Sequence, residues 1–150
     1  MESTVEIVLG RLVEIRIGVG FHTVFDVDAM FERLAKVVAA KLPADTKRVT
    51  VADWRRCSLL SDAAAARMLA RMTVTNPLIA RAAALASRES ASAVMQFFRL
   101  VRESGTSERR LFFHDEELIA WMGEVLTLTE TARLRKFLNE PAAPPGTDAR

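Results

Sequence analysis

The chain has 150 residues, of which half are hydrophobic and 27% are charged. This size and balance are typical of one globular domain with its own core, and they exclude an intrinsically disordered chain. Its 21 Lys and Arg and 19 Asp and Glu residues are interspersed and leave a net charge of only +2, which is too small an excess to indicate a polyanionic partner.

The single cysteine, Cys57, excludes an internal disulfide and suits a reducing compartment. No apolar run approaches the length of a membrane span, and the first residues lack the basic and apolar regions of a signal peptide. We therefore expect a cytoplasmic protein without membrane insertion.

The first 21 residues alternate between apolar and polar side chains, first at Val5, Ile7 and Leu9 and then from Val13 to Phe21. A period of two predicts two half-buried strands, and Gly10-Arg11 between them predicts a hairpin turn. The period then changes to that of a helix, which we expect to begin near Asp26 and to end before Pro43.

The Val-rich segment Lys47–Trp54 predicts a central strand that is buried on both faces. Ser58 and Ser61 are two candidate N-caps for the helix that follows, and Asn76-Pro77 ends that helix. The alanines of Leu78–Ala86 favour a helix, but the break before them and the new capping residues after them favour a short buried strand, which we predict.

The remaining predicted elements are, in chain order, a helix over Ser92–Ser104, a strand over Arg110–His114, a helix from Asp115 and a last helix from the capping box Thr127–Glu130. The order is therefore β-β-α-β-α-β-α-β-α-α. It predicts an α/β fold in which an N-terminal hairpin leads into a mixed sheet, with an extra C-terminal helix. We expect one domain over residues 1–140 and a disordered tail over 141–150, where Pro, Ala and Gly dominate.

Three stretches of this order resemble the STAS/SpoIIAA-like family of bacterial anti-sigma-factor antagonists. They are the hairpin that leads into the Asp26 helix, the strand Val49–Trp54 with the loop and Ser61 helix after it, and the closing strand and helix Arg110–Trp121 with its Ala-Trp pair. The resemblance spans about residues 5–138. It implies a non-catalytic bacterial regulatory module that binds another protein, for example an anti-sigma-type kinase, and it also allows a homodimer.

In the family, the partner binds the loop after the central strand and the start of the next helix. In this chain the resemblance assigns partner binding to Cys57, Ser58, Leu59, Leu60, Ser61, Asp62 and Arg67. Family antagonists often carry a phosphorylated serine there, after an aspartate. This chain has the reverse order, Ser61-Asp62, and lacks the glycine that usually follows, so the phosphorylation switch does not carry over.

Catalytic chemistry has little support in the sequence. Two serines, two histidines and an aspartate could be grouped into a nucleophilic set (Ser58, Ser61, His22, His114 and Asp53), but there is neither a nucleophile elbow nor a phosphate-binding loop. His114 and Glu117 are too few ligands for a metal. We expect no enzyme activity, no cofactor and no metal. Cys57, preceded by two arginines, is either a reactive thiol or a buried structural cysteine.

Two other kinds of binding are open to test. Four arginines (Arg67, Arg71, Arg109 and Arg110) would suit phosphate or nucleic acid if they shared one face, but no interleaved aromatic residues accompany them, and we expect no nucleic acid. The main rival to protein recognition is a carrier of a small molecule or lipid. A large apolar cavity between the sheet and the Asp26 helix would favour that rival.

Overall fold

The computed structural model describes residues 3–140. The expected tail, 141–150, lies outside the described residues. The elements are β1 (Thr4–Glu6), β2 (Leu12–Arg16), α1 (Val24–Lys41), β3 (Arg48–Asp53), α2 (Asp62–Thr75), the 3-10 turn η1 (Asn76–Leu78), β4 (Ile79–Leu85), α3 (Ala91–Glu103), β5 (Arg109–Phe112), α4 (Asp115–Gly123) and α5 (Leu128–Asn139).

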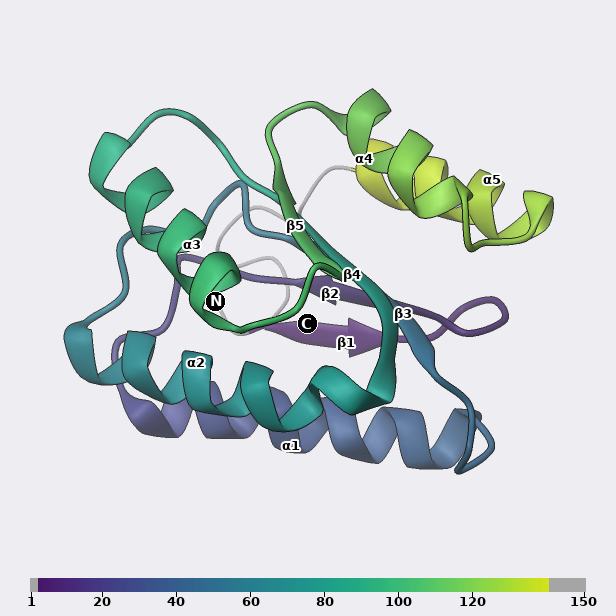
Figure 1. Ribbon diagram of the computed structural model, residues 1–150, viewed down its shortest axis with the longest axis horizontal. Helices are drawn as coiled ribbons and strands as arrows, with labels where there is room; N and C mark the ends of the chain where they lie inside the picture. Colours follow the sequence, from purple (N-terminus) through teal and green to yellow (C-terminus); the bar gives the residue numbers. More distant parts are fainter. Residues whose placement is uncertain (1–2, 141–150) are drawn as a thin grey trace, which may run out of the picture.

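The five strands form one mixed sheet in the order β1-β2-β3-β4-β5 (Figure 1). β1 and β2 pair antiparallel, and every later neighbour pairs parallel. A sheet that grows in one direction through right-handed crossovers places each crossover helix on the same face. Accordingly α1, α2 and α3 pack on one face, and α4 and α5 cover the other. The predicted mixed α/β sheet with an interior strand β3 is confirmed.

Alternate residues of each strand supply the two cores. On β3, Val49 and Val51 face α4 and α5, whereas Ala52, and Trp54 directly after the strand, face α1 and α2. Both faces of β3 are therefore covered, as its valine-rich sequence predicts. Within residues 3–140, no helix is both long and apolar enough to cross a membrane.

Within the ambiguous segment 78–86, residues Ile79–Leu85 form a strand, β4, as predicted. The 3-10 turn at Asn76-Pro77 separates it from α2, and the Asn76 side chain donates to the carbonyl oxygen of Ser104 at 2.6 Å. The start of α1 differs slightly from the prediction. Thr23 is the N-cap, and Asp26 is the third residue of the helix, where its carboxylate accepts the N–H of Thr23.

Candidate functional site

Two loops meet at the carboxyl ends of β2 and β3. The carbonyl oxygen of Val19 accepts both the N–H and the hydroxyl of Ser58, at 2.9 and 2.8 Å. The hydroxyl of Ser61 donates to the carbonyl oxygen of His22 at 3.1 Å. Gly20, with φ +131°, lies close to Cys57 and Ser58, so a side chain there would be strained and crowded. The predicted partner-binding loop is therefore part of a two-loop surface.

Neighbouring leucines of this loop point in opposite directions. Leu60 is only 2% exposed, while Leu59 is 51% exposed. The side chain of Gln96, on α3, accepts the N–H of Leu60 at 2.8 Å and donates to its carbonyl oxygen at 3.0 Å. This clamp holds Leu60 in the core and keeps Leu59 outside.

Cys57 is also buried, and burial raises the pKa of its thiol to about 12. Of the two alternatives for this residue, burial and the raised pKa favour the structural cysteine, because a thiol with so high a pKa is not ionised near neutral pH. The prediction that Cys57 and Leu60 bind a partner concerns two buried residues. Their side chains belong to the core and position the loop, and they are not presented to solvent.

Of the two candidate caps, only Ser61 caps α2. Its hydroxyl oxygen accepts the N–H of Ala64 at 3.1 Å. Ser58 is not a cap, because its hydroxyl is used in the contact with Val19. Asp62 is exposed in the first turn of α2, where its negative charge is favoured by the positive end of the helix dipole.

Arg67 joins α2 to α1. Its guanidinium donates to Asp28 at 2.6 Å, and Arg71 donates to the other carboxylate oxygen of Asp28 at 3.0 and 3.1 Å. Burial opposes ionisation of Asp28, but the hydrogen bonds from the two arginines outweigh it and lower the pKa of this carboxyl. The positive charge of Arg67 is thus paired with a carboxylate of the same domain.

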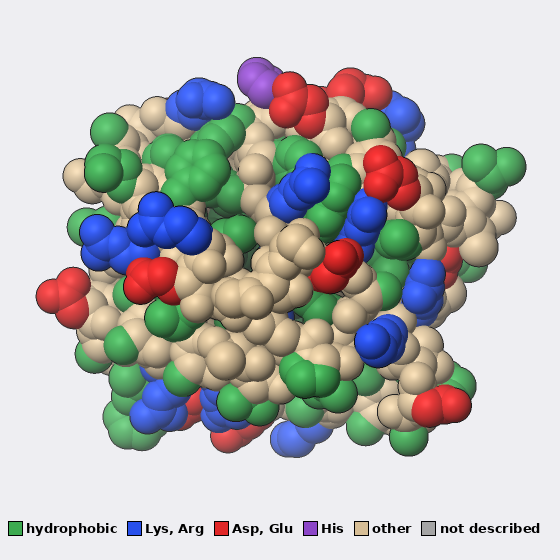
Figure 2. Space-filling view, in the orientation of Figure 1, with side chains coloured by type: hydrophobic (Ala, Val, Ile, Leu, Met, Phe, Trp, Pro, Cys, Tyr) green, Lys and Arg blue, Asp and Glu red, His purple; other side chains and the backbone are tan. Residues whose placement is uncertain are grey.

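The four arginines considered for phosphate or nucleic-acid binding do not share a face. Arg67 and Arg71 bind Asp28, Arg109 is held beneath the end of α2, and Arg110 lies over the ring of Trp121 on the opposite face of the sheet. Figure 2 shows charged side chains of both signs interspersed over the visible face of the molecule. This distribution agrees with the small net charge and offers no focused field for a polyanion.

The candidate nucleophilic set is not assembled. Both loop serines bond to backbone carbonyls, and Asp53 accepts two hydrogen bonds from the Arg55 guanidinium on the side of the sheet that α5 covers. His114 precedes α4 without a side-chain capping bond. In the described part of the chain, no hydrogen bond joins the hydroxyl of either serine to an imidazole ring or to the Asp53 carboxylate. Residues 3–140 also contain no cluster of three or more His, Cys, Asp or Glu suited to a metal ion.

Several exposed apolar side chains at this end of the sheet were not predicted from the sequence. Val19 is 45% exposed, Phe25 at the start of α1 is 78% exposed, and Met95 near the start of α3 is 69% exposed. Phe25 lies outside the buried stripe of α1, and this position in the helical pattern could have indicated that it is exposed. We call Val19, Phe25, Ser58, Leu59 and Asp62 the recognition face.

No protein-family model matches the sequence, and no curated protein matches it either. Among solved structures, the chain is similar to an uncharacterized protein of the DUF3478 family with a SpoIIAA-like fold from Shewanella loihica PV-4. The TM-score is 0.58 at 18% sequence identity, and the match covers 81% of this chain and 94% of that chain. A likeness at this identity shows the fold, so the resemblance predicted from the sequence is confirmed at that level. The chain has a SpoIIAA-like α/β fold.

Proposed function

We propose that the domain is a non-catalytic regulatory module that binds another protein through the recognition face. The observation that carries this proposal is Leu59. This large apolar side chain is half exposed in a loop that hydrogen bonds from Ser58 and to Gln96 hold in place. A rigid, exposed apolar residue surrounded by polar groups is typical of an interface anchor.

Position in the fold supports the same surface. In open α/β sheets, functional loops lie beyond the carboxyl ends of the strands. In this protein the loops after β2 and β3 meet at that edge. The Ser61 cap takes the N–H of Ala64, so the first N–H groups of α2 remain directed toward a partner's carbonyl or carboxylate oxygen. The partner is therefore expected to offer an apolar pocket next to a hydrogen-bond acceptor.

The test begins with a photo-crosslinking residue at position 59, which identifies the bound protein in the native organism. Leu59→Asp is then compared with wild type in a binding titration against the purified partner. Loss of a central anchor of about 2 kcal/mol corresponds to roughly 30-fold weaker affinity. The melting temperature of Leu59→Asp should stay close to that of wild type, since the side chain already contacts water.

Leu128→Asp is the matched control, because Leu128 is 92% exposed at the start of α5 and lies outside the recognition face. It should change neither binding nor melting. Leu60→Asp should prevent folding, since Leu60 is buried. A folded Leu59→Asp protein with undiminished affinity would contradict the proposal. Crosslinking of position 59 only to a second copy of the chain would replace the regulatory partner by a homodimer.

A further inference from the structure

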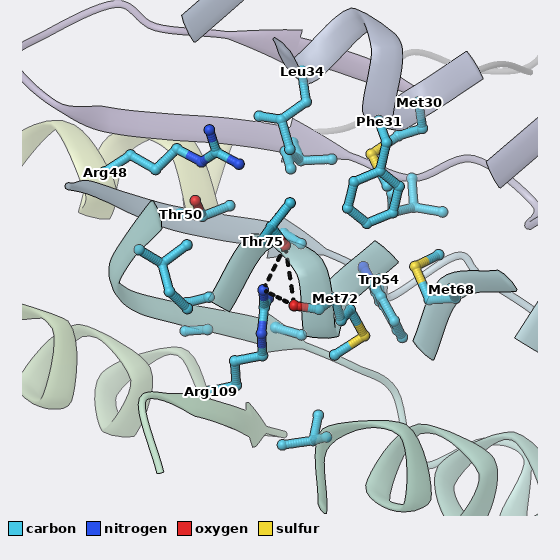
Figure 3. A pocket seen from close by; sticks show the side chains of 18 of the residues that line it. Met30, Phe31, Leu34, Arg48, Thr50, Trp54, Met68, Met72, Thr75 and Arg109 are labelled. Atoms are coloured by element: carbon cyan, nitrogen blue, oxygen red, sulfur yellow. Dashed lines mark hydrogen bonds between the residues drawn. The ribbon is translucent and has the colours of Figure 1, made fainter. Parts of the chain in front are cut away.

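A cavity of about 80 Å³ lies between the sheet and helices α1 and α2 (Figure 3). The sheet leaves space on this side because small side chains occupy neighbouring positions, with Ala52 on β3 paired to Ala84 on β4. Opposite them are the flexible side chains of Met30, Met68 and Met72. Methionine adapts to irregular space, so these walls can move apart around a guest.

One end of this apolar cavity carries polar groups that lack partners. Arg48 and Thr50, two residues apart on β3, are 6% and 8% exposed, and both line the cavity. In the part of the chain that the structure describes, the buried Nε of Arg48 and the buried hydroxyl of Thr50 have no hydrogen-bond partner. Within residues 3–140, no carboxylate forms an ion pair with Arg48. Burial without compensation lowers the pKa of its guanidinium.

A second arginine enters the cavity from β5. The strand register places Thr50, Ala82 and Arg109 in one row across β3, β4 and β5. Parallel neighbours are ~4.8 Å apart, so Thr50 and Arg109 are separated by about 10 Å at the backbone, within reach of an extended arginine. Arg109 therefore brings a further positive charge toward the polar end of the cavity.

Among residues 3–140, Arg109 is held by neutral acceptors and by no carboxylate. It donates to the side-chain oxygens of Asn76 and Thr75 at 2.8 and 2.9 Å and to the carbonyl oxygen of Met72 at 3.1 Å. These contacts give Arg109 a structural role at the negative end of the α2 dipole. They do not neutralise its charge, and burial together with the nearby charge of Arg48 lowers the pKa of Arg109 to about 10.

Burying an unpaired cation in an apolar space is strongly unfavourable, and two such cations also repel each other. A structural role for Arg109 leaves Arg48 and Thr50 unexplained. One bound anion would both compensate the buried positive charge and accept the unpaired donors, because a carboxylate can accept from a guanidinium and a hydroxyl together. The rest of the cavity wall is hydrocarbon, so the anion must carry an apolar group.

We propose that this cavity binds a small amphipathic carboxylate, with its carboxylate at Arg48 and Thr50 and its hydrocarbon chain between the sheet and helices α1 and α2. Arg109 lies within electrostatic reach of the head group. This site is separate from the recognition face, since Arg48 and Arg109 begin β3 and β5, whereas the recognition face follows the carboxyl ends of β2 and β3. The proposal goes beyond protein recognition and does not depend on it.

Octanoate is the probe, with octanol as the same chain without the charge and acetate as the same charge without the chain. Calorimetric titration of wild type should show one octanoate site, at least tenfold tighter than for either control compound. Bound octanoate should also raise the melting temperature in proportion to its excess over Kd. Chemical-shift changes should be confined to the lining residues of the cavity.

Arg48→Met keeps the length of the side chain and removes the charge, so octanoate should bind at least tenfold more weakly and no better than octanol. Thr50→Val tests the hydroxyl in the same way. Arg102→Met, an exposed arginine on α3, is the control and should leave octanoate affinity unchanged. Without ligand, Arg48→Met should melt no lower than wild type, because no native partner is lost.

Equal affinities of wild type for octanoate and octanol would overturn the proposal. So would an Arg48→Met protein that retains octanoate affinity, or one that melts well below wild type, since the arginine would then have a structural partner. Tighter binding of octyl phosphate than of octanoate would overturn the assignment of a carboxylate head group. Leu59→Asp should bind octanoate as wild type does. The proposed carboxylate site and the proposed protein recognition can therefore be refuted independently of each other.

Discussion

The carboxylate of Glu130 ties the β-hairpin turn to the last helix. One oxygen accepts the N–H of Arg11 at 2.9 Å, and the other accepts the N–H of Thr127 at 2.9 Å as part of the α5 capping box. Glu130 is only 6% exposed, and Gly10, with φ +59°, is the residue whose added Cβ would collide with it. Replacing Glu130 should therefore loosen the hairpin and α5 together.

Glu130→Gln keeps the size of the side chain but turns one acceptor into an NH2 group that faces an N–H donor. A hydrogen bond to a charged group contributes about 1.5–3 kcal/mol, so we expect the free energy of unfolding to fall by about 2–3 kcal/mol. For a domain of this length, that loss lowers the melting temperature by roughly 6–10 °C. Urea unfolding at pH 7 measures the first quantity, and a thermal scan measures the second.

The pH dependence provides a second measurement. Burial opposes ionisation of Glu130, but the hydrogen bonds from Thr127 and Arg11 outweigh it and lower the pKa of this carboxyl from its ordinary value of 4.5. A lowered pKa in the folded state stabilises the protein above pH 4.5, and this contribution is lost as the pH falls through the folded pKa. The difference between wild type and Glu130→Gln should be constant above pH 6 and smaller at pH 3.

Glu116→Gln is the matched control. Glu116 pairs with Arg135 at 2.6 Å, but both side chains are at least half exposed, so the loss should stay below about 1 kcal/mol. A Glu130→Gln protein that loses no more stability than this control would refute the reasoning. So would a stability difference that does not change between pH 7 and pH 3.

Two further predictions concern buried groups. Arg133 holds the buried carboxylate of Glu14 with two hydrogen bonds of 2.6 Å, so Arg133→Met should cost about 3–5 kcal/mol, while the double variant with Glu14→Leu should recover most of it in urea unfolding. Equal losses in the single and double variants would contradict this. Burial raises the pKa of Cys57 to about 12, so a disulfide reagent at pH 8 should modify it only after unfolding, and rapid reaction of the folded protein would contradict the assignment.

The fold could be predicted because the residues that begin and end its helices and strands act locally. Asn76 keeps helical dihedral angles, but Pro77 has no backbone N–H with which to continue the α2 ladder, so the chain turns there, and this break was enough to identify β4 despite its alanines. The start of α1 was displaced because Thr23 and Asp26 are both good capping residues, and the choice between them depends on a reciprocal capping box. Helix boundaries are therefore less predictable than the elements themselves.

The candidate recognition face could be predicted only as a segment. The position of the loop after a central strand indicated it, but adjacent leucines carry no pattern that says which one is exposed. The choice is made by Gln96, 36 residues from Leu60, whose side chain pairs with the backbone of Leu60. Such a long-range contact has no signature in a single sequence.

The cavity could not be predicted from the sequence, because it depends on how the strands of the sheet align with one another. In the sequence, Arg109 and Arg110 are adjacent and equally basic, yet strand alternation directs the guanidinium of Arg109 toward α2 and that of Arg110 toward Trp121 on α4. Which of them meets Thr50 depends on how β5 aligns with β4 and β4 with β3, and a shift by one residue would exchange the two faces. The alanines of β4 are likewise good helix formers by propensity, but on a strand beside Ala52 their small volume leaves the space that Arg48 borders. The same residues therefore suggest a helix or a surface patch when taken one at a time, and a binding cavity only when the sheet aligns them.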